Sequence, residues 1–167
     1  MKLNMSWRID APAAQVWSLI ADGYGDVGHW TGILKTSYLK APGWPVEVGA
    51  ERVCVLPNGI TVTETLTELS PETRTLAYRA DDVPWPFTAT TNRWTLHEAG
   101  PGACRATSEV QGGVVRVMRP LTPLFRALVR RSCNRFIDDL RDQLAQPGDR
   151  DAATPSGGHP QTASPAE

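Results

Sequence analysis

The sequence predicts an α+β fold in which an antiparallel sheet packs against one long final helix. Strand-like segments follow one another through the middle of the chain, helical periodicity lies outside them, and the strongest amphipathic pattern comes last. Strands gathered in one run, with helices outside it, are typical of antiparallel α+β domains. At 167 residues, 41% of them hydrophobic, the chain is long enough for one domain with its own core.

The first 40 residues predict two strands separated by short helical segments. Apolar and polar residues alternate over Leu3–Ile9, which indicates a half-buried strand. Asp10-Ala11-Pro12 is typical of a helix start, so a short helix is expected over Ala13–Ala21. The following segment as far as Trp30 holds too much glycine for more than a turn or two, and Ile33–Leu39 is expected to be the second strand.

The central part of the chain predicts an antiparallel meander of five strands. Asn58-Gly59 is the strongest hairpin signal, because both residues of the favoured turn need positive φ. Gly112-Gly113 are expected to end the meander and to lead into the final helix. The five segments are Ala50–Leu56, Ile60–Leu69, Thr75–Ala80, Phe87–His97 and Ala103–Gln111.

The last apolar stripe, Val117–Leu144, predicts a long amphipathic helix. Thr122-Pro123 is typical of an N-cap followed by proline at the first helical position, and Gln146-Pro147-Gly148 ends the helix. We expect the whole stripe to be buried against the sheet, with Leu128 at its centre. The stripe recurs at three- and four-residue steps through Leu121, Leu124, Phe125, Leu128, Val129, Phe136, Ile137, Leu140 and Leu144.

The domain is expected to span residues 1–146, and residues 147–167 are expected to be a disordered tail rich in proline, glycine, serine and alanine. The net charge of −1 argues against a nucleic-acid partner, because nucleic-acid binding needs a basic surface. No apolar run is long enough to span a membrane, and the first ten residues lack the core of a signal peptide, so a cytoplasmic protein is expected.

Histidines and cysteines are scattered without the spacing of a metal site. We therefore expect no metal and no cofactor, and three reduced thiols rather than a disulfide framework. No Ser-His-Asp set or phosphate-binding glycine loop stands out.

Several segments, taken in order, resemble one known family. Ile9-Asp10-Ala11-Pro12 with Val16-Trp17, Val48–Arg52, Val62–Leu66 and Arg74–Arg79 resemble the START-related polyketide cyclase/dehydrase and lipid-transport superfamily (SRPBCC). The resemblance covers about residues 2–145 and implies the helix-grip fold, a curved antiparallel sheet of about seven strands wrapped around the final helix. It also implies a hydrophobic cavity and a hydrophobic small-molecule ligand, either lipid or polyketide-like.

The resemblance leaves catalysis open, because some members are cyclases or aromatases and others only bind a ligand. A third possibility is a partner-binding module with a filled core, docking through the arginines of the final helix or through the sheet edges. The chain is expected to be a monomer or a homodimer.

Glu64 is the expected charged residue of the pocket. Strand alternation places it on one face with Val62 and Glu68. The alternative is that Glu64 pairs with Arg52 or Arg79 in solvent. Burial in an apolar pocket disfavours a charged carboxylate unless a cation or hydrogen bonds compensate. In related hormone-binding members the matching strand glutamate faces the ligand, which favours the pocket, and we expect a glutamine replacement to leave the fold intact.

Glu64, Tyr78 and Asn92 are the candidate catalytic residues, because they could move protons in a cyclisation or dehydration. Tyrosine and tryptophan also offer a polar group on an apolar body, although Trp94 could be simple core packing. Trp85 and Phe87 lie in or beside a long loop and could cover the pocket. The expected ligand-binding residues are Trp30, Glu64, Tyr78, Trp85, Phe87, Asn92, Trp94, Leu124 and Leu128.

Overall fold

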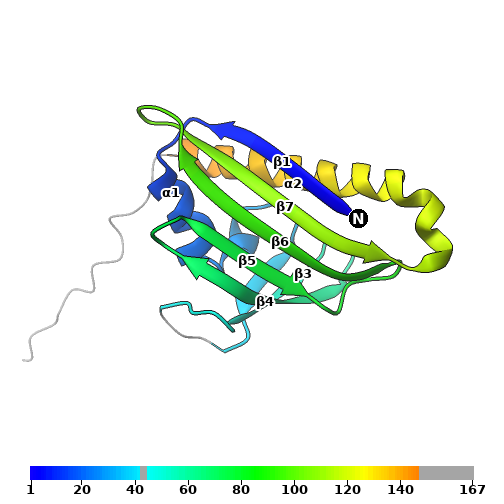
Figure 1. Ribbon diagram of the computed structural model, residues 1–167. Helices are drawn as coiled ribbons and strands as arrows, with labels where there is room; N and C mark the ends of the chain where they lie inside the picture. Colours follow the sequence, from blue (N-terminus) through cyan, green and yellow to red (C-terminus); the bar gives the residue numbers. More distant parts are fainter. Residues whose placement is uncertain (42–44, 147–167) are drawn as a thin grey trace, which may run out of the picture.

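The computed structural model describes residues 1–41 and 45–146 (Figure 1). The expected tail, 147–167, lies outside the described residues. The strands are β1 (Lys2–Ile9), β2 (Thr36–Leu39), β3 (Glu51–Val55), β4 (Thr61–Ser70), β5 (Thr75–Ala80), β6 (Phe87–Glu98) and β7 (Cys104–Val114). The helices are α1 (Ala13–Trp17), η1 (Ser18–Asp22), η2 (Val27–His29), η3 (Arg116–Leu121) and α2 (Thr122–Ala145).

The seven strands form one antiparallel sheet in the order β1-β7-β6-β5-β4-β3-β2. Consecutive strands from β2 to β7 are neighbours, and β1 returns to pair with β7. The sheet curves, and α2 runs along it beside β1, while α1 lies near one end (Figure 1). The predicted helix-grip α+β fold is therefore confirmed, with the expected seven strands and the long final helix.

The main core lies between the sheet and the helices α1 and α2. Trp94 of β6 stacks on Trp7 of β1 with ring centroids 5.8 Å apart, and it contacts Phe136 of α2 at 5.5 Å. Burying such large rings removes apolar area from water and so stabilises the fold. The fully buried side chains of this core include Ile9, Val16, Tyr24, Leu66, Leu76, Ile137 and Leu140.

A β-bulge in β4 reverses the strand alternation after Leu66. Leu66 pairs with Tyr78, but Glu68, two residues on, pairs with the next position, Ala77. The extra residue between them turns Glu68 to the outer face, where Arg93 donates two hydrogen bonds to its carboxylate, both 2.8 Å long. The expectation that Glu68 shares the inner face with Glu64 was therefore wrong.

Gly112 and Gly113 do not end the meander, because β7 continues through them to Val114. A Cβ atom at Gly112 would lie 2.6 Å from the Thr90 side chain, and one at Gly113 would lie 2.0 Å from the Thr88 hydroxyl. The register of β6 against β7 shifts between Phe87 and Thr90. The two glycines therefore allow an irregular part of β6 to approach β7 closely, rather than breaking the strand.

The final helix is packed along a narrower face than its apolar stripe predicted. It begins at Thr122, whose hydroxyl donates to the Arg119 carbonyl 2.6 Å away instead of capping the helix. Its buried apolar residues are Phe125, Ile137 and Leu140, with Val129, Phe136 and Leu144 half-buried. Leu121, Leu124 and Leu128 are exposed, so the expectation that the whole stripe is buried was wrong.

Candidate functional site

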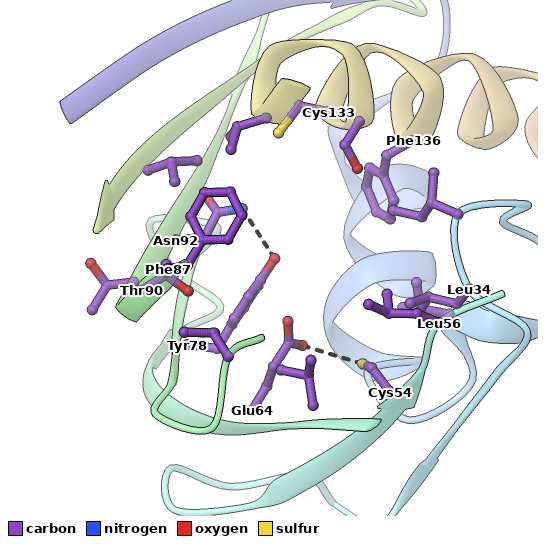
Figure 2. Close-up of a pocket in the computed structure, with 18 of the residues that line it drawn as sticks. Leu34, Cys54, Leu56, Glu64, Tyr78, Phe87, Thr90, Asn92, Cys133 and Phe136 are labelled. Atoms are coloured by element: carbon purple, nitrogen blue, oxygen red, sulfur yellow. Dashed lines mark hydrogen bonds between the residues drawn. The ribbon is translucent and has the colours of Figure 1, made fainter. Parts of the chain in front are cut away.

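A pocket of about 300 Å³ lies between the sheet and α2 (Figure 2). Glu64 and Tyr78 extend into it from the sheet, opposite Cys133 and Phe136 of α2. Apolar side chains make up most of the wall, and the polar groups come from β3 to β6 and one serine of α2. The apolar lining includes Val27, Ile33, Leu34, Leu56, Val62, Val83, Phe87, Trp94, Val110, Val129 and Phe136.

Arg52 and Glu64 form an ion pair in the pocket wall. They are directly opposed in the β3–β4 register, so both side chains leave the same face of the sheet. Nε and Nη2 of Arg52 both donate to Oε2 of Glu64, Nε at 3.0 Å. Arg52 Nη1 donates to the Tyr24 carbonyl at 2.8 Å, and its guanidinium lies 4.1 Å from the centre of the Tyr24 ring. The Tyr78 ring centre lies 5.2 Å away, so the guanidinium is held by one carboxylate, one carbonyl and two aromatic faces.

The ion pair keeps Arg52 charged despite its burial. Only 6% of the Arg52 side chain and 16% of the Glu64 side chain are exposed. Burial, the largest single effect, lowers the pKa of Arg52, but the Glu64 carboxylate together with Tyr24, Cys54 and Tyr78 outweighs it, so the net shift is upward. Glu64 was expected either inside the pocket or paired with Arg52 or Arg79 in solvent; it lines the pocket, and its pair with Arg52 is buried there.

Cys54 supports the same carboxylate. Its thiol donates to Oε2 of Glu64, with sulfur and oxygen 3.5 Å apart (Figure 2). Burial, with the nearby Glu64 charge, raises the pKa of Cys54 to about 12. The thiol is therefore neutral at physiological pH and acts as a hydrogen-bond donor rather than a nucleophile. Oε2 accepts all three of these bonds, so Oε1 of Glu64 is the oxygen available to a molecule in the pocket.

A second polar chain runs across β5, β6 and β7. Ser108 Oγ donates to Asn92 Oδ1 at 2.7 Å. Asn92 Nδ2 in turn donates to the Tyr78 hydroxyl oxygen at 3.0 Å, as Figure 2 shows. Tyr78 and Asn92 are paired in register, as are Trp94 and Ser108, which brings the three polar groups to one face. Because Tyr78 accepts from Asn92, its own proton can be donated to a ligand.

Burial raises the pKa of Tyr78 above its ordinary value, and the Glu64 charge acts in the same direction. The phenol therefore keeps its proton at neutral pH. Tyr78 can donate a hydrogen bond to a carbonyl or hydroxyl oxygen, but it is a poor proton acceptor.

The remaining walls come from α2 and two loops. Burial raises the pKa of the Cys133 thiol, on the α2 side, to about 11. Phe87 packs edge-on against Phe125 with ring centroids 5.2 Å apart, which joins the start of β6 to α2. The pocket-lining residues Ile33 and Leu34 follow Gly32, whose N–H donates to the buried carboxylate of Asp139 on α2 at 2.7 Å. Asp139 thus holds this loop against the helix.

The structure brings together five of the nine expected ligand-binding residues. Glu64, Tyr78, Phe87, Asn92 and Trp94 all line the pocket.

The other four do not line the pocket. Trp30 lies behind the wall, with its ring 5.1 Å from that of Phe136. Trp85 points to solvent from the loop before β6, and Leu124 and Leu128 lie on an exposed side of α2. Leu124 and Leu128 were expected on the ligand-facing side because periodicity gives the stripe but not the angle at which a helix meets its sheet.

Sequence reasoning missed Cys54, Ser108 and Cys133 as groups of the site, and it gave Arg52 only as a possible partner in solvent. Arg52 could have been predicted from the register of the β3–β4 hairpin. With the turn at Asn58-Gly59 centred on Asn58, pairing residues outward from the turn places Arg52 opposite Glu64. No comparable signal exists for Ser108 and Cys133, since their place depends on strand and helix packing across the whole fold.

Within residues 1–41 and 45–146, no group of three or more histidine, cysteine, aspartate or glutamate side chains is arranged to hold a metal ion. None of the described helices combines the length and apolar character that crossing a membrane requires.

Comparison with known proteins gives a family match over nearly the whole described chain. The model of the family described as polyketide cyclase / dehydrase and lipid transport matches residues 1–145. No match is found among curated proteins.

Solved structures share the fold at low sequence identity. A putative uncharacterized protein from Bacillus thuringiensis is 19% identical, with a TM-score of 0.72, covering 87% of this chain and 100% of that one. A START superfamily protein from Mycobacterium smegmatis is 13% identical, with a TM-score of 0.66, covering 85% and 95%. The di-domain ARO/CYC protein BexL from the BE-7585A biosynthetic pathway is 16% identical, with a TM-score of 0.67, covering 86% of this chain and 46% of BexL. At these identities the likeness shows the fold alone.

Proposed function

The chain belongs to the polyketide cyclase/dehydrase and lipid transport family, and we propose that it binds a small hydrophobic molecule carrying an oxygen group in the pocket under α2. The observation that carries this proposal is the distribution of polar groups in the pocket wall. Apolar side chains surround the space, while Tyr78 Oη and Glu64 Oε1 offer one donor and one acceptor from the sheet. Mostly apolar pockets with a few placed polar groups are typical of small-molecule sites.

The chemistry of the wall defines the ligand class. Tyr78 can donate to a carbonyl or hydroxyl oxygen, and Glu64 Oε1 can accept from a hydroxyl group. The Glu64 charge is already balanced by Arg52, so the pocket does not need a cationic ligand. The volume of about 300 Å³ suits a fused-ring or short-chain molecule.

A fluorescent-probe titration tests the Tyr78 part of this proposal. Prodan is a naphthalene with a ketone, and N-phenyl-1-naphthylamine is a probe of similar size without oxygen. Tyr78→Phe removes only the hydroxyl, so we expect it to weaken prodan binding by roughly 2- to 10-fold, the value of one hydrogen bond. Binding of N-phenyl-1-naphthylamine should be unchanged.

Tyr38→Phe is the matched control, because Tyr38 is exposed on β2 and outside the pocket wall. Failure of both probes to bind the wild-type chain would contradict the pocket proposal. Equal prodan affinity in wild type and Tyr78→Phe would remove Tyr78 from the site. Native mass spectrometry of freshly purified protein would identify any hydrophobic molecule that it carries.

A cyclase-type reaction is the second candidate. An intramolecular aldol condensation needs a proton donor at the carbonyl oxygen and a proton acceptor at carbon. Tyr78 Oη supplies the first and Glu64 Oε1 is the candidate for the second, and both belong to the same pocket. A polyketone substrate mimic followed by mass spectrometry separates the two functions: loss of water catalysed by wild type but not by Tyr78→Phe favours the enzyme, and return of intact substrate favours the carrier.

A further inference from the structure

Exposed apolar side chains follow one another along η3 and the first part of α2. Val117 is 77% exposed, Leu121 44%, Leu124 55% and Leu128 51%. They recur at steps of four, three and four residues, so Leu124 and Leu128 lie on one side of α2. This side is not the one that covers the pocket. Large apolar side chains that gather on a surface mark an interaction site.

The loop before β6 brings a tryptophan to the same end of the molecule. The backbone N–H of Val115, which directly precedes η3, donates to the carbonyl of Pro86 at 2.9 Å. Trp85, the residue before Pro86, is 69% exposed. Pro84, directly before Trp85, and Phe87, two residues after it, line the pocket, so this apolar surface adjoins the pocket wall.

The same segment is strongly basic although the chain as a whole has a net charge of −1. Residues 115–136 contain six arginines and no aspartate or glutamate. Arg131 and Arg135 continue the line of Leu124 and Leu128 at three- and four-residue steps. Among the described residues, Arg135 is the one arginine of these six that forms an ion pair, with Asp139. The six are Arg116, Arg119, Arg126, Arg130, Arg131 and Arg135.

We propose that this end of the molecule docks on an anionic lipid bilayer. We call it the η3–α2 surface, and it consists of Trp85, Val117, Leu121, Leu124, Leu128, Arg119 and Arg131. Leucine and tryptophan side chains enter the boundary between headgroups and acyl chains, while arginines remain at the level of the anionic headgroups.

The charge distribution favours a bilayer over a second copy of the chain. Two copies meeting through this surface would bring together two sets of arginines, Arg119 and Arg131 from each copy, that form no ion pair within residues 1–41 and 45–146, which costs free energy. An anionic bilayer instead satisfies both the apolar line and the arginines around it. The docking proposal is argued from this surface alone and does not depend on the proposed ligand. Docking in this way would place the pocket wall beside the bilayer.

Vesicle co-sedimentation of the full chain tests the proposal. We expect binding to vesicles of phosphatidylcholine mixed with phosphatidylglycerol, and little binding to phosphatidylcholine alone. Raising the salt from about 0.1 M to about 1 M shortens the Debye length from roughly 10 Å to 3 Å and should weaken binding. Leu124→Gln with Leu128→Gln, and separately Arg119→Gln with Arg131→Gln, should each weaken it. Each arginine near an anionic surface contributes on the order of fivefold, so the second pair should lose about 25-fold.

Two control variants match these changes elsewhere on the protein. Val48→Gln replaces an exposed apolar residue in the loop before β3. Arg93→Gln with Arg105→Gln removes the same charge from exposed positions on β6 and β7. Both controls should bind vesicles as wild type does, and circular dichroism melting should show that every variant is folded. If the leucine pair does not fold, the arginine pair and its control decide the question.

Three results would overturn the proposal. The first is absence of binding to the mixed vesicles at low salt. The second is equal loss of binding in the Arg93/Arg105 control and the Arg119/Arg131 variant, which would mean attraction to the whole protein. The third is a dimer, measured by light scattering, that the leucine pair dissociates, because the surface would then be covered by a second copy. Probe binding in the pocket is measured without vesicles, so failure there is distinguishable from failure of docking.

Discussion

Arg52 is the residue on which the polar wall of the pocket depends. Its guanidinium bridges Glu64 on β4 and the Tyr24 carbonyl beyond η1, so it joins three separate segments. A buried cation with one carboxylate partner is costly to leave alone, because neither water nor another anion replaces the lost partner. The pair therefore matters to stability as well as to the chemistry of the pocket.

Glu64→Gln should destabilise the protein, contrary to the expectation from sequence that it would leave the fold intact. The variant leaves the Arg52 charge buried without its carboxylate, and removing one partner of a buried pair costs roughly 3 kcal/mol. Urea unfolding at neutral pH measures the change. Replacing both partners, Arg52→Met with Glu64→Leu, should recover most of the loss because no buried charge remains.

Glu72→Gln provides the control for this prediction, since Glu72 is exposed in the turn between β4 and β5. Its effect on the free energy of unfolding should stay within about 0.5 kcal/mol. A Glu64→Gln variant as stable as the Glu72→Gln variant would show that Arg52 is solvated well enough to do without its partner.

Strand parity predicted the direction of Glu64, Tyr78 and Asn92 because side chains alternate strictly along regular strands. It failed at Glu68 because the bulge after Leu66 adds one residue to β4. A bulge is set by the fit between neighbouring strands, so a single strand's sequence does not reveal it.

α2 shows what an amphipathic pattern establishes at the scale of one element. The pattern predicted a helix and its approximate ends. It did not separate the residues that pack on the sheet from the adjoining exposed line, because both are apolar and lie side by side around the helix: exposed Leu124 directly precedes buried Phe125. The predicted stripe therefore combined two apolar surfaces of the helix: the one that packs on the sheet, and the exposed one formed by Leu121, Leu124 and Leu128.

Leu128→Asp should therefore fold, whereas the buried position expected for Leu128 from the sequence would not tolerate an unpaired charge. Leu128 is 51% exposed, so a charge there remains solvated and the melting temperature should change by no more than a few degrees. Ile137→Asp, on the packed face with 0% exposed, should unfold the protein or make it aggregate. Circular dichroism melting compares the two, and similar behaviour of both variants would contradict the assigned helix face.

At the scale of the whole molecule, the sheet and α2 enclose both an aromatic core and the pocket. The large rings of Trp7, Trp94 and Phe136 form the aromatic core, and the pocket lies beside them. Element order and family resemblance predicted this architecture from the sequence. The residues of the site were predicted less completely. The positions of Cys54, Ser108 and Cys133 depend on the strand register and on the angle between α2 and the sheet, which the sequence does not give.

The buried thiol and phenol groups in and beside the pocket predict that the whole fold loses stability in alkaline solution. Burial raises the pKa of Cys54 from 9.0 to about 12 and that of Cys133 from 9.0 to about 11, and it raises the pKa of Tyr24 and Tyr78 as well. The folded state therefore holds these protons more tightly than the unfolded chain. Their stabilising contribution is complete below the unfolded pKa and is lost as pH rises through the folded pKa, which for the two thiols means from about pH 9 upward.

Urea unfolding under reducing conditions, repeated from about pH 8 to about pH 10.5, measures this loss. Each thiol should contribute a slope approaching about 1.4 kcal/mol per pH unit over the upper part of that range. Cys54→Ser keeps a donor to Glu64 but does not titrate there, so its stability should fall less steeply than that of wild type. Cys133→Ser should flatten the curve in the same way, whereas a wild-type curve that stays level to pH 10.5 would mean that solvent reaches these thiols in the folded state.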